Sequence, residues 1–220
     1  MHIPVARANG VTVFCPSEGR YAFYNSPYPA HRLSTGIDIY PGKGFGDVVA
    51  SPVSGRVTLI KKLKAPKASR FIDHGHDTVI LVESRENPRR LVKILHAEPC
   101  VQEGDVLETG QTLGTLIRSG YFGYSTAPHI HLEVRRLEDP LRARGGLHFE
   151  RLQEIGNVPK LGILECLVLQ SKAEYAEVEI SGASQLGLQC EIGGAPGVLD
   201  GGFPYYGWLG VHTDINPPEV

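Results

Sequence analysis

Two histidines separated by one apolar residue are the side chains of this sequence best suited to chemistry. They are His129 and His131, in the run STAPHIHLEV at residues 125–134. On an extended strand, side chains two positions apart point to the same face, so both imidazoles project together while Ile130 and Leu132 enter the core. Two imidazoles on one face indicate a metal site or a proton-transfer site. The alternative is a half-buried strand whose histidines serve only packing.

A carboxylate within an apolar run is the next candidate group. Asp38 alternates with Ile37 and Ile39, so its carboxylate lies opposite two apolar side chains and needs a partner. A backbone amide, an arginine or a metal ion could serve. A further histidine, His96, ends the apolar run that starts at Leu91.

Length and composition limit the class of protein. The chain has 220 residues, enough to bury a sizeable core, and its formal net charge is −2. Charged residues are scattered, and no basic face indicates a nucleic-acid partner. No apolar run could span a bilayer, and the N-terminus lacks the layout of a secretory signal. The sequence as given predicts a soluble cytoplasmic protein without membrane or nucleic-acid partners, although a secreted chain trimmed of its signal would look the same.

Cysteine use excludes one kind of metal site. The four cysteines, at positions 15, 100, 166 and 190, are far apart and form no CxxC pair, which argues against a structural zinc knuckle. They are expected as small buried hydrophobes, with one disulfide left open as an alternative.

Short apolar runs separated by glycine and proline must position the candidate groups, and they indicate an all-β fold. The segment 101–116 carries glycines at sharp turns and is expected as a hairpin, and the segment 61–69 is expected as an exposed loop. The other strands expected before residue 140 are Val11–Phe14, Tyr21–Tyr24, Ile37–Ile39, two strands within Asp47–Ile60, Thr78–Glu83, Leu91–His96 and the strand of the histidine pair.

The pattern changes after residue 140. We place a first β domain over residues 1–140 and a small β-rich extension over residues 141–220. The extension is expected to hold a short helix around Phe149–Ile155 and a glycine-rich loop at 193–204. Its expected strands are Leu161–Gln170, Ala173–Ser181, Gln185–Ile192 and the aromatic run Tyr205–His212. The aromatic cluster is expected to pack a core, with a ligand site or a dimer interface as alternatives.

Five segments occur in the order found in the lysostaphin/LytM-type zinc endopeptidases, which this sequence resembles from Tyr21 to Val134. They are STGIDI (34–39), VASPVSGRV (49–57), LHA (95–97), EGD through GQTLG (103–114) and STAPHIHLEV (125–134). The resemblance implies an antiparallel barrel-sandwich domain of the duplicated hybrid motif type, whose groove holds one zinc ion. It also implies hydrolysis of peptide cross-links, so that the partner is a peptide or peptidoglycan-like substrate.

In such proteins the zinc is held by a histidine, an aspartate four residues later and the second histidine of the His-x-His pair. Asp38 and His131 match the last two ligands, whereas the first position is Ser34. A hydroxyl that keeps its proton replaces an imidazole poorly, so Ser34→His is expected to raise zinc affinity. The third ligand is not identified. His31 is a replacement only if its segment loops, because its offset along a strand would turn it away.

His96 and His129 match the two catalytic histidines of the resemblance. Their implied work is to position and deprotonate the attacking water and to stabilise the oxyanion that forms at the scissile carbonyl. Two hypotheses compete. The chain is a zinc metalloendopeptidase whose incomplete metal site weakens its activity, or it is a catalytically inactive relative that uses the groove to bind peptides or glycans or as a scaffold.

Overall fold

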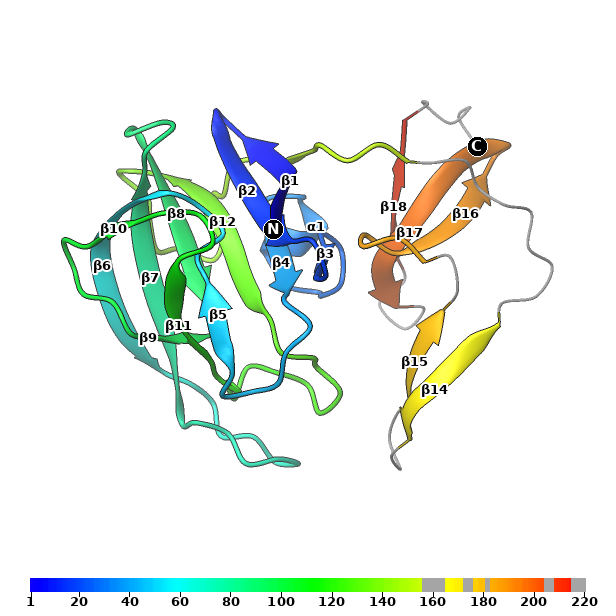
Figure 1. Ribbon diagram of the computed structural model, residues 1–220, viewed down its shortest axis with the longest axis horizontal. Coiled ribbons are helices and arrows are strands. Elements are labelled where there is room, and N and C mark those ends of the chain that lie inside the picture. The colour runs from blue at the N-terminus through cyan, green and yellow to red at the C-terminus, as the bar shows by residue number, and fades with distance from the viewer. Residues whose placement is uncertain (156–164, 172–175, 181–182, 204–207, 215–220) are drawn as a thin grey trace.

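The computed structural model describes residues 1–155, 165–171, 176–180, 183–203 and 208–214, and their regular secondary structure is almost entirely β (Figure 1). They include one short helix, α1 at Pro29–Arg32. The all-β fold class is confirmed. The strands are β1 His2–Ala8, β2 Val11–Pro16, β3 Arg20–Ala22, β4 Ile37–Tyr40, β5 Val48–Ala50, β6 Gly55–Lys64, β7 His76–Ser84, β8 Arg90–Leu95, β9 Ala97–Pro99, β10 Val106–Leu107, β11 Thr112–Leu116, β12 Ile130–Arg136, β13 Glu150–Arg151, β14 Cys166–Ser171, β15 Ala176–Ile180, β16 Leu188–Ile192, β17 Ala195–Phe203 and β18 Trp208–Thr213.

A seven-stranded antiparallel sheet, in the order β10-β6-β7-β8-β12-β4-β3, forms the centre of the fold. A smaller sheet, β5-β11-β9, lies over one face of it (Figure 1). Side chains from both sheets share one apolar core, among them Val49 and Leu116 from the small sheet and Val92 and Leu132 from the large one. The curled, two-layered arrangement agrees with the predicted barrel-sandwich.

Alternation along the central strands decides which side chains face away from this core. On β12, Ile130 and Leu132 belong to the core, so His131 and Glu133 lie on the opposite face of the sheet. The neighbouring strand β4 repeats the pattern and puts Asp38 on that same face. The groups suited to chemistry therefore gather on one side of the large sheet.

The segment 101–116 is not a hairpin, which corrects the prediction. Its two strands do not pair with each other, because β10 pairs with β6 and β11 lies between β5 and β9. Gly104 and Gly110 do make the expected sharp turns, with φ of 97° and 87°. The loop expected at 61–69 also starts later, since β6 continues to Lys64 in register with β7. The glycines thus predicted where the chain turns, whereas the pairing of its strands depends on segments distant in sequence.

Two further predictions of secondary structure were wrong. In place of a helix around Phe149–Ile155, strand β13 pairs with β1, and Phe149 joins the apolar core. The loop expected at 193–204 is mostly strand β17, which lies between β16 and β18. Its Gly201 faces the backbone of Asn25, so this glycine marks a close approach of two chain segments and not a loop.

The C-terminal residues form two small sheets, β14-β15 and β16-β17-β18. Parts of the predicted strands, at 161–164, 173–175, 181 and 205–207, lie outside the described residues. The three-stranded sheet is held to the first part of the chain through Gln185, whose carbonyl oxygen accepts the Tyr21 N–H at 3.0 Å. The Gln185 amide donates to the carbonyl oxygens of Ser17 and Gly19.

The four cysteines are free, and only Cys15 is buried. Cys100 and Cys166 are exposed and Cys190 is half-buried, so the expectation of small buried hydrophobes was wrong for these three.

Within the described part of the chain, no helix has the length and apolar character needed to cross a bilayer.

Candidate functional site

The register of two neighbouring strands brings Asp38 and His131 together. β12 pairs with β4 so that His131 lies directly opposite Asp38. The His131 Nδ1 atom is 2.8 Å from Asp38 Oδ1, and both side chains are buried. Directly opposed residues on one face of an antiparallel pair are within side-chain reach of each other. The adjacency that the resemblance implied is present, and the role of the two residues as ligands remains a prediction.

A third group, His31, enters the site from a helical turn instead of a strand. Its Nε2 atom lies 3.2 Å from Asp38 Oδ1, and its side chain is 2% exposed. Helix α1 begins with Pro29, which has the fixed φ that suits a first helical position. The segment is therefore looped, which is the condition under which His31 could replace the missing histidine.

Ser34 ends this turn and does not face Asp38. Its φ is 52°, and its N–H donates to the His31 carbonyl oxygen at 3.3 Å. The next N–H, of Thr35, donates to the Ala30 carbonyl oxygen at 2.8 Å, which completes a Schellman ending. The Ser34 hydroxyl donates to the Tyr24 hydroxyl at 2.6 Å. The serine at the position where the resemblance implied a ligand therefore belongs to the turn that carries His31 to the site.

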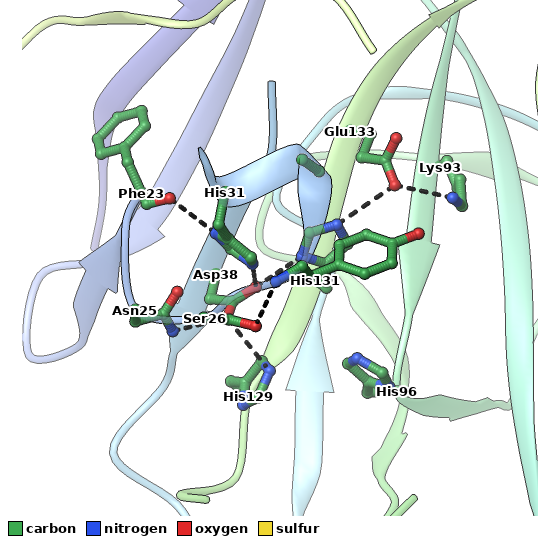
Figure 2. Close-up of polar contacts among 12 residues, drawn as sticks. Phe23, Asn25, Ser26, His31, Asp38, Lys93, His96, His129, His131 and Glu133 are labelled. Carbon is green, nitrogen blue, oxygen red and sulfur yellow. Dashed lines mark hydrogen bonds and ion pairs between the residues drawn. The ribbon is translucent and has the colours of Figure 1, made fainter. Parts of the chain in front are cut away.

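The second nitrogen of each imidazole is held by an acceptor. His31 Nδ1 is 2.8 Å from the Phe23 carbonyl oxygen, which can only accept, so Nδ1 carries the proton and Nε2 presents its lone pair to the site. His131 Nε2 is 3.4 Å from Glu133 Oε1, which leaves Nδ1 directed at Asp38 (Figure 2). Carbonyl and carboxylate partners of this kind orient the histidines that bind metals in proteins.

The donor set fits a zinc ion. One ligand atom from each of His31, Asp38 and His131 lies within 4.8 Å of the others. Two imidazoles and one carboxylate match a ligand set of catalytic zinc sites. A Cβ added at Gly36 would lie 2.7 Å from His131 Cε1, so the absence of a side chain there makes room for the ring.

The charges around the two buried carboxylates differ. Glu133 is neutralised by two cations, with Lys93 Nζ 2.7 Å from its Oε1 and an Arg135 guanidinium nitrogen 2.7 Å from its Oε2. Asp38 contacts imidazoles, and its Oδ2 accepts from the Asn25 amide at 2.7 Å. Imidazoles, unlike lysine and arginine, give up a proton readily, so a buried carboxylate paired with them can accept a metal cation in place of that proton.

The pKa values in the cluster follow from burial and from these partners. Burial opposes ionisation of Asp38, but His31 and His129 outweigh it and hold the pKa of the carboxyl well below its usual range. Burial lowers the pKa of His129 to about 4, which makes its imidazole neutral near pH 7. Burial also disfavours a charged His131, yet hydrogen bonds to Asp38 and Glu133 raise its pKa to about 9. Negative charge therefore concentrates on Asp38, beside a neutral His129.

The two predicted catalytic histidines lie next to this cluster. His129 Nδ1 is 2.8 Å from the Ala127 carbonyl oxygen, so its Nε2, 3.3 Å from Asp38 Oδ2, faces the cluster. His96 Nδ1 is 2.6 Å from Asp77 Oδ2, and the His96 backbone N–H donates to Asp77 Oδ1 at 3.0 Å. The two imidazole centroids are 5.3 Å apart. Each ring is thus fixed through Nδ1, and its Nε2 is available to a substrate or a water molecule.

Sequence reasoning did not identify three of these supporting groups. Glu133 lies two positions after His131 on the same strand face, and that alternation was a signal that could have found it. Asp77 follows His76 at the start of an apolar strand and gives no local sign of its distant partner His96. The carbonyl group of Phe23 belongs to the backbone, so no residue type could have marked it.

A groove of about 1680 Å³ is lined by His31, Asp38, His96, His129 and His131. Aromatic side chains line it beside the histidines, including Tyr28, Tyr40 and Phe122, whose ring stacks on His129 with centroids 4.8 Å apart. Leu186 from the C-terminal part also lines it. An elongated ligand could therefore touch both parts of the chain while it lies against the histidines.

Comparison with known proteins gives one family match. The model of a family described as "Domain of unknown function (DUF8155) N-terminal domain" matches residues 12–151. Among curated proteins, none matches the chain significantly.

Solved structures that are similar to the chain include three peptidases. The solution structure of lysostaphin, a Staphylococcus simulans protein, is 22% identical with a TM-score of 0.34, over 54% of this chain and 44% of lysostaphin. A variant catalytic domain of a prophage-encoded M23 protein from Enterococcus faecalis is 20% identical with a TM-score of 0.37, over 60% of this chain and 88% of that domain. A zinc-containing peptidase from Vibrio cholerae is 21% identical with a TM-score of 0.32, over 60% of this chain and 45% of that protein.

The chain thus spans less than half the length of lysostaphin and of the Vibrio cholerae peptidase. The chemistry open to this chain depends on its own side chains.

Proposed function

The chain belongs to the family of DUF8155 N-terminal domains, and from that premise we propose that it is a zinc-dependent peptidase. In this proposal His31, Asp38 and His131 hold the zinc ion. His96 and His129 are its catalytic residues. The substrate is a peptide, with peptidoglycan-like cross-links as the class that the sequence resemblance suggests.

One observation carries the proposal: three buried ligand atoms of the right chemistry lie within 4.8 Å of one another. Structural zinc sites use four protein ligands, whereas catalytic sites use three and leave a position open. Three protein groups beside an open groove favour the catalytic kind. His31, which sequence reasoning left only as a conditional replacement, completes the set.

The bound zinc ion would supply a Lewis acid that makes hydroxide available at neutral pH. His129 is neutral near pH 7, and its Nε2 faces the cluster, so it can accept a proton from the attacking water. His96 presents an Nε2 that Asp77 leaves free, and in its protonated form it can donate to the oxyanion of the scissile carbonyl.

Metal content and hydrolysis test the proposal together. Purified protein dialysed against zinc is expected to hold close to one zinc ion per chain, and His31→Ala is expected to lose it. The matched control is His148→Ala, because His148 is exposed and lies outside the cluster. Zinc content is measured by mass spectrometry. Hydrolysis is measured on a set of glycine-rich peptides and peptidoglycan stem peptides.

Each outcome has a meaning. A wild-type protein that binds no zinc, or a His31→Ala variant that binds it as well as the wild type, contradicts the metal site. Zinc binding that depends on His31 without hydrolysis of any peptide contradicts the peptidase. That result supports the second hypothesis, a catalytically inactive peptide- or glycan-binding module.

A further inference from the structure

The segment between β3 and α1 carries two of the contacts that orient the candidate metal ligands. The Phe23 carbonyl oxygen accepts from His31 Nδ1 at 2.8 Å, and the Asn25 amide donates to Asp38 Oδ2 at 2.7 Å. Residues 23–28 lie between the end of β3 and the start of α1 and belong to neither element. No strand ladder therefore fixes the direction of the Phe23 carbonyl group, and something else must hold it.

A carboxylate from the C-terminal sheet holds this backbone. Asp200 on β17 is 4% exposed, and its Oδ2 accepts the Phe23 N–H at 2.6 Å. The same oxygen lies 2.9 Å from Nε2 of His212 on β18. A hydrogen bond from a backbone N–H to a buried carboxylate is among the stronger kinds in proteins. The Phe23 backbone is thus bound on one side by Asp200 and on the other by His31.

Packing of the C-terminal sheet on this segment is close. The His212 ring lies 5.0 Å from the Phe23 ring and 5.1 Å from the Tyr24 ring, centroid to centroid. A Cβ added at Gly210 would lie 2.1 Å from Tyr24 Cβ, and a Cβ added at Gly201 would lie 2.8 Å from Asn25 Cα. Only glycine lets β17 and β18 approach the segment this closely.

We propose that Asp200 is a positioning residue for the metal ligand His31, acting through the backbone of Phe23. The inference rests on the proposed function, because it takes His31 as a ligand. Asp200 fixes Phe23, the Phe23 carbonyl fixes the tautomer and direction of the His31 ring, and the ring directs Nε2 at the metal position. The C-terminal sheet is thereby part of the metal site, although none of its residues belongs to the ligand set.

Removal of the Asp200 carboxylate is therefore expected to weaken metal binding. A group that hydrogen-bonds a metal-bound histidine contributes about 10- to 100-fold to metal affinity. Asp200 is one hydrogen bond further from the metal than the Phe23 carbonyl, so its contribution should be at the lower end. We expect Asp200→Ala to lower zinc affinity about tenfold, measured by competition with a chromophoric chelator. Asp200→Asn keeps an oxygen that can accept the Phe23 N–H and is expected to restore most of the affinity. Glu191→Ala, an exposed carboxylate on the same sheet, is the matched control and should change nothing.

A second readout separates positioning from general support of the fold. In the zinc-loaded wild type, the proton on His31 Nδ1 should give a slowly exchanging imidazole resonance in NMR spectra, because it is buried and bonded to the Phe23 carbonyl. Asp200→Ala should broaden or shift that resonance, whereas the corresponding resonance of His129, bonded to the Ala127 carbonyl, should stay unchanged. If Asp200→Ala does not fold, the same two measurements are made on Asp200→Ser, whose hydroxyl is too short to reach the Phe23 N–H.

The outcomes distinguish this inference from the proposed function. Zinc binding that is lost in His31→Ala but unchanged in Asp200→Ala overturns the inference alone. A wild-type protein without zinc overturns both. Lower zinc affinity in Asp200→Ala, restored in Asp200→Asn and accompanied by a change of the His31 resonance only, supports the inference.

Discussion

The two halves of the candidate metal site are built in different ways. The strand half consists of Asp38 and His131, which face each other because β4 and β12 pair in a fixed register. The turn half consists of His31, which stands on a four-residue helix and takes its direction from the Phe23 carbonyl. Neighbouring strands hold the strand half along their length, whereas the turn half depends on the end of α1 and on the C-terminal sheet. The site therefore combines a rigid part with a part that distant contacts can adjust.

Beside the strand half, Glu133 on β12 shares its carboxylate between two buried cations. Glu133→Ala would leave Lys93 and Arg135, 3% and 0% exposed, without their shared carboxylate. Breaking a buried ion pair by removal of one partner costs about 3–5 kcal/mol. We expect a loss of this size in the free energy of unfolding, measured by urea denaturation of the metal-free protein.

Glu138→Ala is the control for this prediction, since Glu138 is exposed just beyond β12 and its loss should cost almost nothing. A Glu133→Ala variant as stable as the wild type would show that Lys93 and Arg135 find other partners. The strand half would then be no more rigid than the turn half.

A smaller loss is expected at the support of His96. Asp77 accepts the backbone N–H groups of Thr78 and His96, and it also accepts from His96 Nδ1. His96 has a φ of 71°, a conformation that these bonds help to maintain. Asp77→Ala is expected to lower the free energy of unfolding by about 1–3 kcal/mol because buried donors lose their acceptor.

The same variant should release the His96 ring without affecting the metal. In ¹⁵N NMR spectra the His96 imidazole should lose the preference for a proton on Nδ1 that Asp77 imposes, while zinc content stays at the wild-type value. A loss of zinc in Asp77→Ala would mean that His96 belongs to the metal site itself and is not a separate catalytic group.

The smallest effect is expected at Ser34, where the proposed site leads to a different expectation from the sequence. In that site His31 takes the ligand position, and the Ser34 hydroxyl donates to Tyr24, so Ser34→His should not raise zinc affinity. Loss of the hydrogen bond to Tyr24 should cost about 1 kcal/mol of stability. Chelator competition should give an affinity equal to or below that of the wild type. A clear gain in affinity would mean that Ser34, and not His31, stands at the ligand position.

The same contrast explains how much could be predicted from sequence. Alternation along strands put Asp38 and His131 on one face, because side-chain direction on a strand depends only on position. His96 and His129 lie just outside β8 and β12, and their roles were inferred from the resemblance. The place of His31 could not be predicted, because it depends on Ser34 adopting a positive φ, a conformation that serine rarely takes.

The pairing of strands that are distant in sequence could not be predicted from the sequence either. The run 101–116 has the glycines of a hairpin, yet its strands pair with β6, β5 and β9. The glycine-rich run of β17 resembled a loop, because the close approach of its Gly201 to Tyr24 and Asn25 is visible only in the folded chain. Local patterns predicted the elements and their faces, and tertiary contacts decided the partners.

X-ray absorption spectroscopy of the zinc-loaded protein tests the central claim most directly, since it counts the imidazoles bound to the metal. We expect two imidazole nitrogens at about 2.0–2.1 Å in the wild type, whereas His31→Ala should retain no zinc to measure. A wild-type spectrum with a single imidazole, unchanged in His31→Ala, would contradict the account, because His31 would then lie near Asp38 without binding the metal.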